Sequence, residues 1–352
     1  MTLAHVAGYG EAMHGNQARV WVLQGARTGD NAQAIELAHR LSLSFEIKPL
    51  AYNPLHNLPN ILLGESAASV GAGRESLRPP WPDLVIATGK RAAPVARWIK
   101  RQSGGRTKLV HLGRPRAPLD AFDLVVTTPQ YGLPPAENAV VAPLPFATPR
   151  PSDPVQIEAW QGEWEYLPRP WLAVLVGAGR YPLRFGAAEA RSLKHAIERE
   201  IEARGGSVIV AGSPRTDAGV LEVLSHFQSP HLSMAWKKDD GGAFQALLSL
   251  ADRFVITSDS VSMISEALSS GKPALAFQLS QTSWRMGWSA QSGITAALAR
   301  SGLLQPPRDI SRLIGDLVQA GYLGILGERE PSRPFMRTDQ HVIERIRQLL
   351  VD

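Results

Sequence analysis

Short apolar runs alternate with longer stretches of helical periodicity along most of the chain. In the first half, apolar runs predict strands over residues 19–24, 45–50, 83–88, 108–112, 124–127 and 140–142. Between them, apolar side chains recur at helical spacing over residues 31–41 and 92–101. This alternation is typical of α/β units with parallel strands.

A proline-rich stretch separates this half from a second half with the same alternation. Its prolines are Pro143, Pro145, Pro149, Pro151, Pro154, Pro168 and Pro170. Prolines at this density interrupt regular pairing and mark a boundary or a stiff connector. Beyond them we predict strands over 171–176, 207–211, 253–257 and 274–277, and helices over 187–204, 218–225, 243–251 and 339–350.

The length of 352 residues exceeds what one hydrophobic core usually serves, so two domains are expected. We place an amino-terminal α/β domain over residues 1–145 and a proline-rich hinge over 146–170. A second α/β domain follows over 171–326. Residues 327–352 form a tail with a final helix.

Composition narrows the classes of function. The chain has no cysteine, which excludes a disulfide framework and a cysteine nucleophile and fits a reducing compartment. The net charge of +5 suits anionic partners such as nucleotide phosphates or lipid head groups. The arginines are scattered, so no nucleic acid partner is expected. No apolar run reaches the ~18 residues of a membrane span and no signal peptide is evident, so we expect a cytoplasmic protein.

The stretch over residues 254–277, FVITSDSVSMISEALSSGKPALAF, is the most informative motif. An apolar run meets a turn and then a helical pattern, and a helix N-terminus attracts phosphate. The residues placed there are Ser258, Asp259 and Ser260. Glu266 falls one turn beyond Ser262 and can reach a sugar hydroxyl. The alternative is an ordinary crossover helix with Ser260 as N-cap and Gly271 as C-cap.

Two further loops follow strands in the same half, and ligands of open parallel sheets bind at such loops. In the loop 177–180, Gly177 and Gly179 leave room for backbone amides to approach a pyrophosphate. Arginines can grip phosphate oxygens with both guanidinium nitrogens. The candidates from these loops are Arg180, Ser213, Arg215 and Thr216. The alternative is a pair of tight turns with solvated arginines.

Several known nucleotide and metal motifs are absent. A dinucleotide fingerprint starting at Gly177 would need glycine at 182, where the chain has Pro182. No glycine-rich turn is followed by Gly-Lys-Ser/Thr, and the nine histidines show no metal-ligand spacing. We therefore expect neither a cofactor nor a metal.

In the first half, the loop from Gly25 to Asp30 again joins a strand to a helix. A carboxylate at position 30 can act as general base, although Asp is also a good N-cap. Gln33, one turn on, can contact a substrate or face solvent. Other strand ends carry residues suited to an anionic acceptor, namely Gly29, Gly89, Lys90, Arg91 and Arg114.

These residues resemble a known family. The motifs are Gly25-x-x-x-Gly29-Asp30-Asn31-x-Gln33, Pro82-Asp83-Leu84-Val85-Ile86-x-x-Gly89-x-x-x-x-Pro94, Phe122-Asp123-Leu124-Val125 and Thr128-Pro129-Gln130-Tyr131. They resemble the mitochondrial fission ELM1-like family, whose bacterial members are often labelled nucleoside-diphosphate-sugar epimerases. The segment Ser258-Asp259-Ser260…Glu266…Gly271-Lys272-Pro273 is similar to the donor-site motif of GT-B glycosyltransferases.

The resemblance implies an α/β, GT-B-like fold with two Rossmann-like domains whose parallel sheets face an interdomain cleft. The nucleotide-sugar donor would bind the second domain and the acceptor the first. By this likeness Glu266 would hydrogen-bond the ribose or sugar, and loops 212–216 and 258–260 would hold the diphosphate. The last helix would cross back onto the first domain. One departure is Asp30, where family members often have His.

The first hypothesis for function is a metal-independent glycosyltransferase that builds a cell-envelope glycan or glycolipid from a nucleotide-diphosphate sugar. Asp30 would be the base, and Arg215, Ser258 and Ser260 would hold the diphosphate. Peripheral contact with the anionic inner face of the membrane is also expected. The alternatives are a nucleotide-sugar 2-epimerase of the same fold and a non-catalytic scaffold or membrane-recruitment protein.

Overall fold

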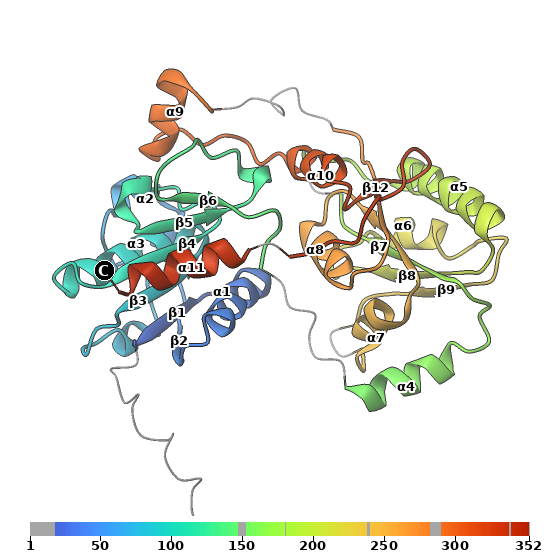
Figure 1. Cartoon of the computed structure of the whole chain (residues 1–352), viewed down its shortest axis with the longest axis horizontal. Coiled ribbons are helices and arrows are strands. Elements are labelled where there is room, and N and C mark those ends of the chain that lie inside the picture. The colour runs from blue at the N-terminus through green and yellow to red at the C-terminus, as the bar shows by residue number, and fades with distance from the viewer. Residues whose placement is uncertain are drawn as a thin grey trace, which may run out of the picture. The chain divides into compact units, whose positions relative to one another are not determined.

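The computed structural model describes residues 18–146, 153–179, 181–237, 240–281, 290–337 and 339–351. The chain forms two compact units. Unit 1 runs to Val125 and includes Ile343–Asp352, and unit 2 is Val126–Val342. Two six-stranded sheets organise the chain (Figure 1).

The first sheet has the strand order β2-β1-β3-β4-β5-β6. Its strand β1 pairs in parallel with both β2 and β3, with Val20 opposite Phe45 on one side and Leu84 on the other. Helices α1 and α3 pack against its central strands. The elements are β1 Val20–Gln24, α1 Thr28–Leu41, β2 Phe45–Pro49, α2 Asn60–Leu63, β3 Leu84–Thr88, α3 Gly89–Gln102, β4 Lys108–Leu112, β5 Leu124–Thr127 and β6 Ala139–Val141.

The second sheet has the order β12-β11-β10-β7-β8-β9, and all its pairings are parallel. Every residue of β7 and β8 is buried, as expected for strands covered on both faces. The elements are α4 Pro154–Glu163, β7 Trp171–Val176, α5 Ala187–Arg204, β8 Ser207–Gly212, α6 Ala218–Val223, β9 His231–Met234, α7 Ala243–Leu250, β10 Arg253–Thr257, α8 Val261–Ser269, β11 Ala274–Phe277, α9 Gly293–Arg300, α10 Ile310–Gln319 and β12 Gly324–Ile325.

The last helix, α11 Gln340–Leu349, returns to unit 1 (Figure 1). Its apolar side chains Ile343 and Ile346 are buried, and Arg347 donates to the carbonyl of Leu41 at the end of α1, at 3.3 Å. The chain therefore completes unit 1 with a segment that follows all of unit 2.

The proline-rich stretch contains a helix. Asp153 caps α4 by accepting from the Val155 amide at 3.0 Å, and Pro154 takes the first helical position, where its missing N–H costs nothing. The sequence pattern did not predict a helix in this stretch. Whether residues 146–170 act as a hinge stays a prediction, as do the expected domain limits.

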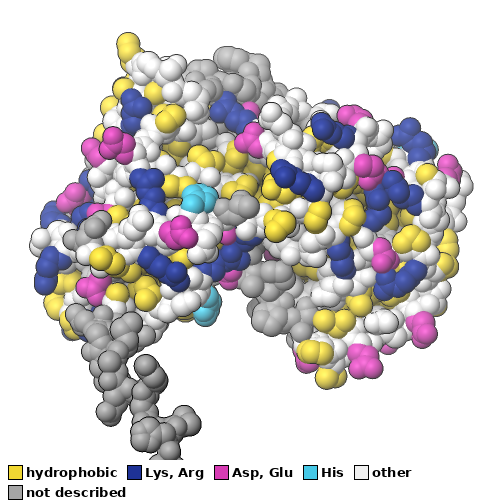
Figure 2. All heavy atoms as spheres, viewed as in Figure 1, with side chains coloured by type: hydrophobic (Ala, Val, Ile, Leu, Met, Phe, Trp, Pro, Cys, Tyr) yellow, Lys and Arg dark blue, Asp and Glu magenta, His cyan; other side chains and the backbone are white. Residues whose placement is uncertain are grey.

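The α/β class, with two Rossmann-like sheets of parallel strands, is confirmed. The cleft expected between the domains stays a prediction. On the face shown in Figure 2, Lys and Arg side chains are spread over both units and interleaved with Asp and Glu. Among the described residues, no helix combines the length and apolar character that a membrane span requires.

Candidate functional site

The three loops singled out in the second half lie side by side. Strands β10, β7 and β8 are neighbours in the second sheet and run parallel, so their carboxyl ends share one edge. The loops that leave this edge begin at Gly177, Ser213 and Ser258. The topology thus assembles a single site from segments about 80 residues apart in sequence.

A carboxylate fills the glycine loop after β7. Asp259 accepts hydrogen bonds from the amides of Ala178 and Gly179 at 2.7 and 2.9 Å. A Cβ on Gly177 would lie 2.3 Å from the Asp259 carboxylate oxygens, so only glycine fits at that position. Gly179 has φ +59° and a Cβ there would meet Phe185 at 2.4 Å. The amides of Ala178 and Gly179, expected to face a pyrophosphate, already have a partner.

The loop after β8 is fastened by Thr216. Its hydroxyl accepts from the Ser213 amide at 2.7 Å and donates to the carbonyls of Val176 and Gly177 at 2.8 and 3.0 Å. Thr216 therefore ties this loop to the end of β7. Arg215, which directly precedes Thr216 in this loop, has an exposed side chain.

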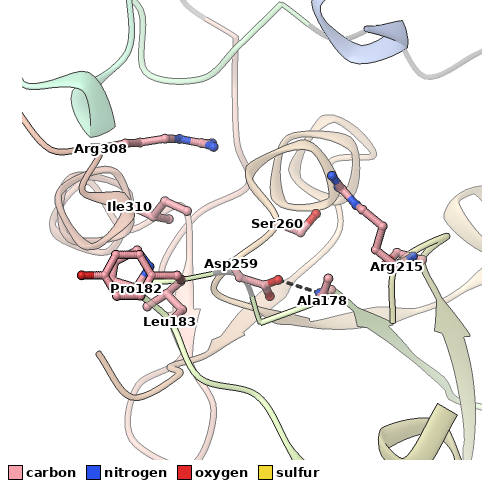
Figure 3. A pocket seen from close by; sticks show the side chains of 11 residues that line it. Ala178, Pro182, Leu183, Arg215, Asp259, Ser260, Arg308 and Ile310 are labelled. Atoms are coloured by element: carbon pink, nitrogen blue, oxygen red, sulfur yellow. Dashed lines mark hydrogen bonds between the residues drawn. The ribbon is translucent and has the colours of Figure 1, made fainter. Parts of the chain in front are cut away.

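These loops enclose a cavity of about 170 Å³ in front of the N-terminus of α8, here named the α8 cavity. In Figure 3, Arg215 and Arg308 extend toward Ser260 from opposite sides, and Asp259 lies at the floor. The lining residues are Gly177, Ala178, Tyr181, Pro182, Leu183, Ser213, Arg215, Asp259, Ser260, Arg308 and Ile310. Two guanidinium groups and one carboxylate leave the lining with a net positive charge.

Helix α8 presents only part of the predicted motif to this cavity. Ser260 holds the N-cap position, yet its side chain makes no capping bond to the helix and lines the cavity. Ser258 is buried and accepts from the Leu279 amide at 2.9 Å, so its hydroxyl fixes the turn. Glu266 is half-buried on α8 and is not among the residues lining the α8 cavity. Arg180 lies outside the described residues.

A second, larger cavity of about 470 Å³ is lined in part by the end of β8. Gly212 lines this aromatic cavity and the next residue, Ser213, lines the α8 cavity. Trp160 is held by a bond from its Nε1 to the Gly241 carbonyl at 2.9 Å. The aromatic side chains of the lining are Trp160, Trp164, Tyr166, Trp236 and Phe244. Its size falls within the range of about 300–1,000 Å³ typical of ligand sites.

The aromatic cavity and Arg308 were not predicted from the sequence. The aromatic residues come from α4, the loop after β9 and α7, and neither a strand at β9 nor a helix at α4 was expected. Arg308 precedes α10 and lies about 50 residues beyond the Ser-Asp-Ser turn. The signal that was available is the aromatic content of 160–171, with three tryptophans in twelve residues.

In unit 1, the predicted base lies on the first turn of α1. Asp30 is the third helical residue and not the N-cap, which is Arg27. Its carboxylate is 3.8 Å from the Arg27 guanidinium, and a Cβ on Gly89 would meet it at 3.2 Å. The ends of β1 and β3 therefore bring Asp30 beside the start of α3. Gln33 is half-buried, and its side chain donates to the Gly29 carbonyl at 3.3 Å.

A group of cations surrounds the start of α3. Lys90 donates to the Asn57 carbonyl at 3.1 Å. Burial, and after it the charges of Arg116 and Arg91, hold the pKa of Lys90 below its usual value. The last of the predicted acceptor-side residues, Arg114, follows β4 and is half-buried. The predicted acceptor-side residues therefore all lie in unit 1, and their role stays a prediction.

Metal ligation has no visible basis in the described part of the chain. Within these residues, no group of three or more His, Asp or Glu side chains is arranged to hold a metal ion.

Comparison with known proteins identifies relatives of the chain. The family model described as mitochondrial fission ELM1 matches residues 28–307. A protein from Arabidopsis thaliana, named mitochondrial fission protein ELM1, is 29% identical over 254 residues, which is 65% of this chain and 59% of the relative. The aligned region thus spans about three fifths of that relative's length.

Solved structures of two kinds resemble the chain over most of its length. UDP-GlcNAc 2-epimerase from Methanocaldococcus jannaschii matches with a TM-score of 0.49 and 11% identity, over 95% of this chain and 99% of the other. The E. coli ADP-heptose lipopolysaccharide heptosyltransferase II matches with a TM-score of 0.45 and 14% identity, over 95% and 98%. The similar solved structures thus include both a sugar epimerase and a glycosyltransferase.

Proposed function

The chain belongs to the mitochondrial fission ELM1 family, and from that premise we propose that unit 2 binds a nucleotide-diphosphate sugar for transfer to an acceptor. The observation that carries the proposal is a pair of cavities in unit 2 that are lined by consecutive residues, Gly212 and Ser213, at the end of β8. One is small and cationic and the other is larger and aromatic. A nucleoside diphosphate has the same two parts, an anionic diphosphate and a planar base joined by a ribose.

The diphosphate would occupy the α8 cavity. Arg215 and Arg308 line it, and guanidinium groups form charge-assisted, bidentate bonds to phosphate. The N-terminus of α8 adds backbone amides and positive partial charge. The Ser260 side chain also lines the cavity and can donate a hydrogen bond to phosphate. Asp259 repels phosphate, so we expect the phosphate oxygens to lie between the two arginines and away from the floor of the cavity. In this arrangement the protein's own cations neutralise the diphosphate, as a divalent metal does in other enzymes.

The base would stack in the aromatic cavity. Trp236 is half exposed and lines that cavity together with Phe244. A stacked aromatic ring typically contributes about 1–3 kcal/mol for each base. The ribose would then lie at Gly212 and Ser213, each of which lines one of the two cavities.

The transfer step would use unit 1. An acceptor hydroxyl would attack the anomeric carbon, the bond from that carbon to the diphosphate oxygen would break, and Asp30 would take the hydroxyl proton. The leaving diphosphate would be stabilised by the arginines and the helix N-terminus. Arg91 and Arg114 would help to hold an anionic acceptor. We propose a cell-envelope glycan or glycolipid as acceptor and action at the inner face of the membrane.

A second candidate is nucleotide binding without transfer. It is favoured by the Arabidopsis relative, whose name refers to mitochondrial fission and not to a sugar. Incubation with a donor sugar and a crude glycolipid acceptor separates the two candidates. Release of nucleoside diphosphate supports transfer. If the donor saturates the protein and is recovered intact, the result supports the second candidate.

Two variants test the placement of the ligand by calorimetric titration. Arg215→Gln should weaken binding of both pyrophosphate and a nucleoside diphosphate by about tenfold or more, because it removes a charge-assisted bond. Trp236→Ala should weaken only the nucleoside diphosphate, because pyrophosphate has no base.

The matched control is Arg191→Gln on the exposed face of α5, which should change neither affinity. If Trp236→Ala weakens pyrophosphate as much as the nucleotide, or if Arg215→Gln weakens neither ligand, the placement is wrong.

A further inference from the structure

An exposed apolar segment in unit 1 plays no part in the proposed binding of a nucleotide sugar. Between β2 and β3, residues 54–62 read PLHNLPNIL. Six apolar side chains of this segment are exposed, and they form what we name the apolar ridge: Pro54, Leu55, Leu58, Pro59, Ile61 and Leu62. Leu62 is 72% exposed and Ile61 53%. Single exposed leucines are normal on soluble proteins, but a continuous group marks a contact surface.

The ridge is fixed to the body of unit 1 by its polar residues. Asn60 is buried, and its side-chain nitrogen donates to the carbonyls of Lys90 and Pro115, both at 2.8 Å. Asn53 accepts from the Leu55 amide at 3.0 Å and donates to the Ala68 carbonyl at 2.7 Å. The segment therefore buries the polar side chain of Asn60 and presents its apolar side chains to solvent.

Cations lie beside the ridge. Lys90 is bonded to the Asn57 carbonyl within the ridge segment, and Arg116 follows the Pro115 that Asn60 contacts. Arg116 and Arg91 lie close enough to Lys90 for their charges to act on it. The carboxylate of Glu65, just after the ridge, is already paired with Arg97 at 3.2 Å. The surface next to the ridge is thus positively charged.

We propose that the apolar ridge and its flanking cations dock unit 1 onto an anionic lipid bilayer. Apolar side chains enter the interfacial layer, and Lys and Arg beside them interact with anionic head groups. A second copy of the chain fits this surface less well, because a twofold interface would bring Lys90, Arg91 and Arg116 of both copies together. Docking requires no nucleotide, so this proposal is independent of the proposed function and is tested separately from it.

Docking would place the cations of the predicted acceptor side at the membrane. Lys90 and Arg91 would then lie at the depth of the head groups, where a glycolipid or phospholipid presents its charge. The surface therefore favours an acceptor or partner lipid that stays in the bilayer.

Co-sedimentation of the full chain with vesicles tests the proposal. We expect binding to vesicles of phosphatidylglycerol mixed with phosphatidylcholine, and much weaker binding to phosphatidylcholine alone. The double variant Ile61→Ser/Leu62→Ser should lose about tenfold or more in affinity, because it removes apolar surface that would enter the lipid. Arg116→Gln should lose about fivefold.

Two matched controls make the same kinds of change away from the ridge, one removing an exposed apolar side chain and one removing a positive charge. Val155→Ser in α4 removes a valine that is also 72% exposed, and Arg191→Gln removes an exposed cation from α5. Both should bind as the unchanged chain does. Because Ile61 and Leu62 are exposed, the double variant should also keep the thermal midpoint of the unchanged chain.

Three results would overturn the proposal. The first is that the unchanged chain fails to sediment with anionic vesicles. The second is that the double variant binds these vesicles as tightly as the unchanged chain does. The third is that the unchanged chain binds neutral vesicles as tightly as anionic ones. Self-association that is abolished by the double variant, seen in sedimentation equilibrium without lipid, would assign the ridge to an interface between copies instead.

Discussion

Asp259 lies where an incoming phosphate would otherwise meet free backbone amides. Its carboxylate takes the amides of Ala178 and Gly179, while Gly177 makes room for it. The loop after β7 is therefore shaped around an internal anion. A ligand's phosphates must then find their donors elsewhere in the cavity, at Arg215, Arg308 and the start of α8.

Gly177→Ala tests this local arrangement. The new methyl group would meet a carboxylate that is bonded to two amides, so the loop must shift. We expect a loss of about 1–3 kcal/mol in the free energy of unfolding, measured by urea titration. Gly162→Ala in α4 is the control, since nothing lies within 4 Å of a Cβ there. Equal stability of the two variants would contradict the contact with Asp259.

His111 gives a pH-dependent test of the core of unit 1. Its ring is buried, with its centroid 5.2 Å from that of the Phe122 ring. Its Nε2 lies 3.2 Å from the Gly89 carbonyl oxygen. Burial lowers the pKa of His111 to about 4 from its usual 6.5. Between these values the unfolded chain binds one more proton than the folded chain, so stability falls as the pH falls through this window.

The expected slope for this one group is at most about 1.4 kcal/mol per pH unit. Urea unfolding of the unchanged chain and of His111→Gln across the window measures it, and the variant should show a flatter dependence. His195→Gln, on an exposed histidine of α5, should keep the full slope. The same slope in all three proteins would show that His111 titrates normally in the folded state.

At the scale of elements, the positions of central strands were predicted more accurately than those of the helices and edge strands around them. The strands β4, β5, β7, β10 and β11 were predicted with the bounds that the structure has, because most residues of each are buried and apolar. Helix α4 was missed because its two ends are rich in proline, although Asp153 and Pro154 form a good helix start. Strand β9 was missed because its four residues include His231 and Ser233 and are only half-buried.

The candidate site was predicted in part for the same reason. Loops that follow buried strands could be located, and so Arg215, Asp259 and Ser260 were found. Arg308 could not be found, because nothing local shows that the segment before α10 packs at the edge of β7 and β10. Ser258 and Thr216 lie in these loops, but their hydroxyls make hydrogen bonds within the protein, and donor binding by them stays a prediction.

Helix α11 supplies the prediction at this scale. Ile346 is fully buried, and its helix follows the whole of unit 2 in sequence. Ile346→Ala should lower the stability of unit 1 by about 2–5 kcal/mol through loss of apolar contact and a residual cavity. Hydrogen exchange followed by mass spectrometry locates the effect. Faster exchange should appear in α1, β1 and β3 and not in β7, β8 or β10.

Exposed Leu298 in α9 offers a control for that measurement. Leu298→Ala removes a leucine that is 38% exposed and should leave exchange in α1, β1 and β3 unchanged. An Ile346→Ala protein whose exchange rises equally in both sheets would mean that α11 stabilises the chain as a whole.

At the scale of the whole molecule, two parallel sheets each present strand ends to their own loops. The alternation of apolar runs and helical periods was enough to predict this architecture. It could not show that unit 1 is built from two separate stretches of the chain, since that depends on the packing of α11. Membership of the ELM1 family and the paired cavities of unit 2 together lead to the central claim that the protein binds a nucleoside diphosphate.

Isothermal titration of the full chain with the common nucleoside diphosphates and their sugars tests this claim most directly. We predict saturable binding of one molecule per chain for at least one base. The matching nucleoside alone should bind more weakly, because it leaves the α8 cavity empty. Heats at the level of dilution for every nucleotide, at concentrations that saturate ordinary sugar-nucleotide sites, would contradict the claim.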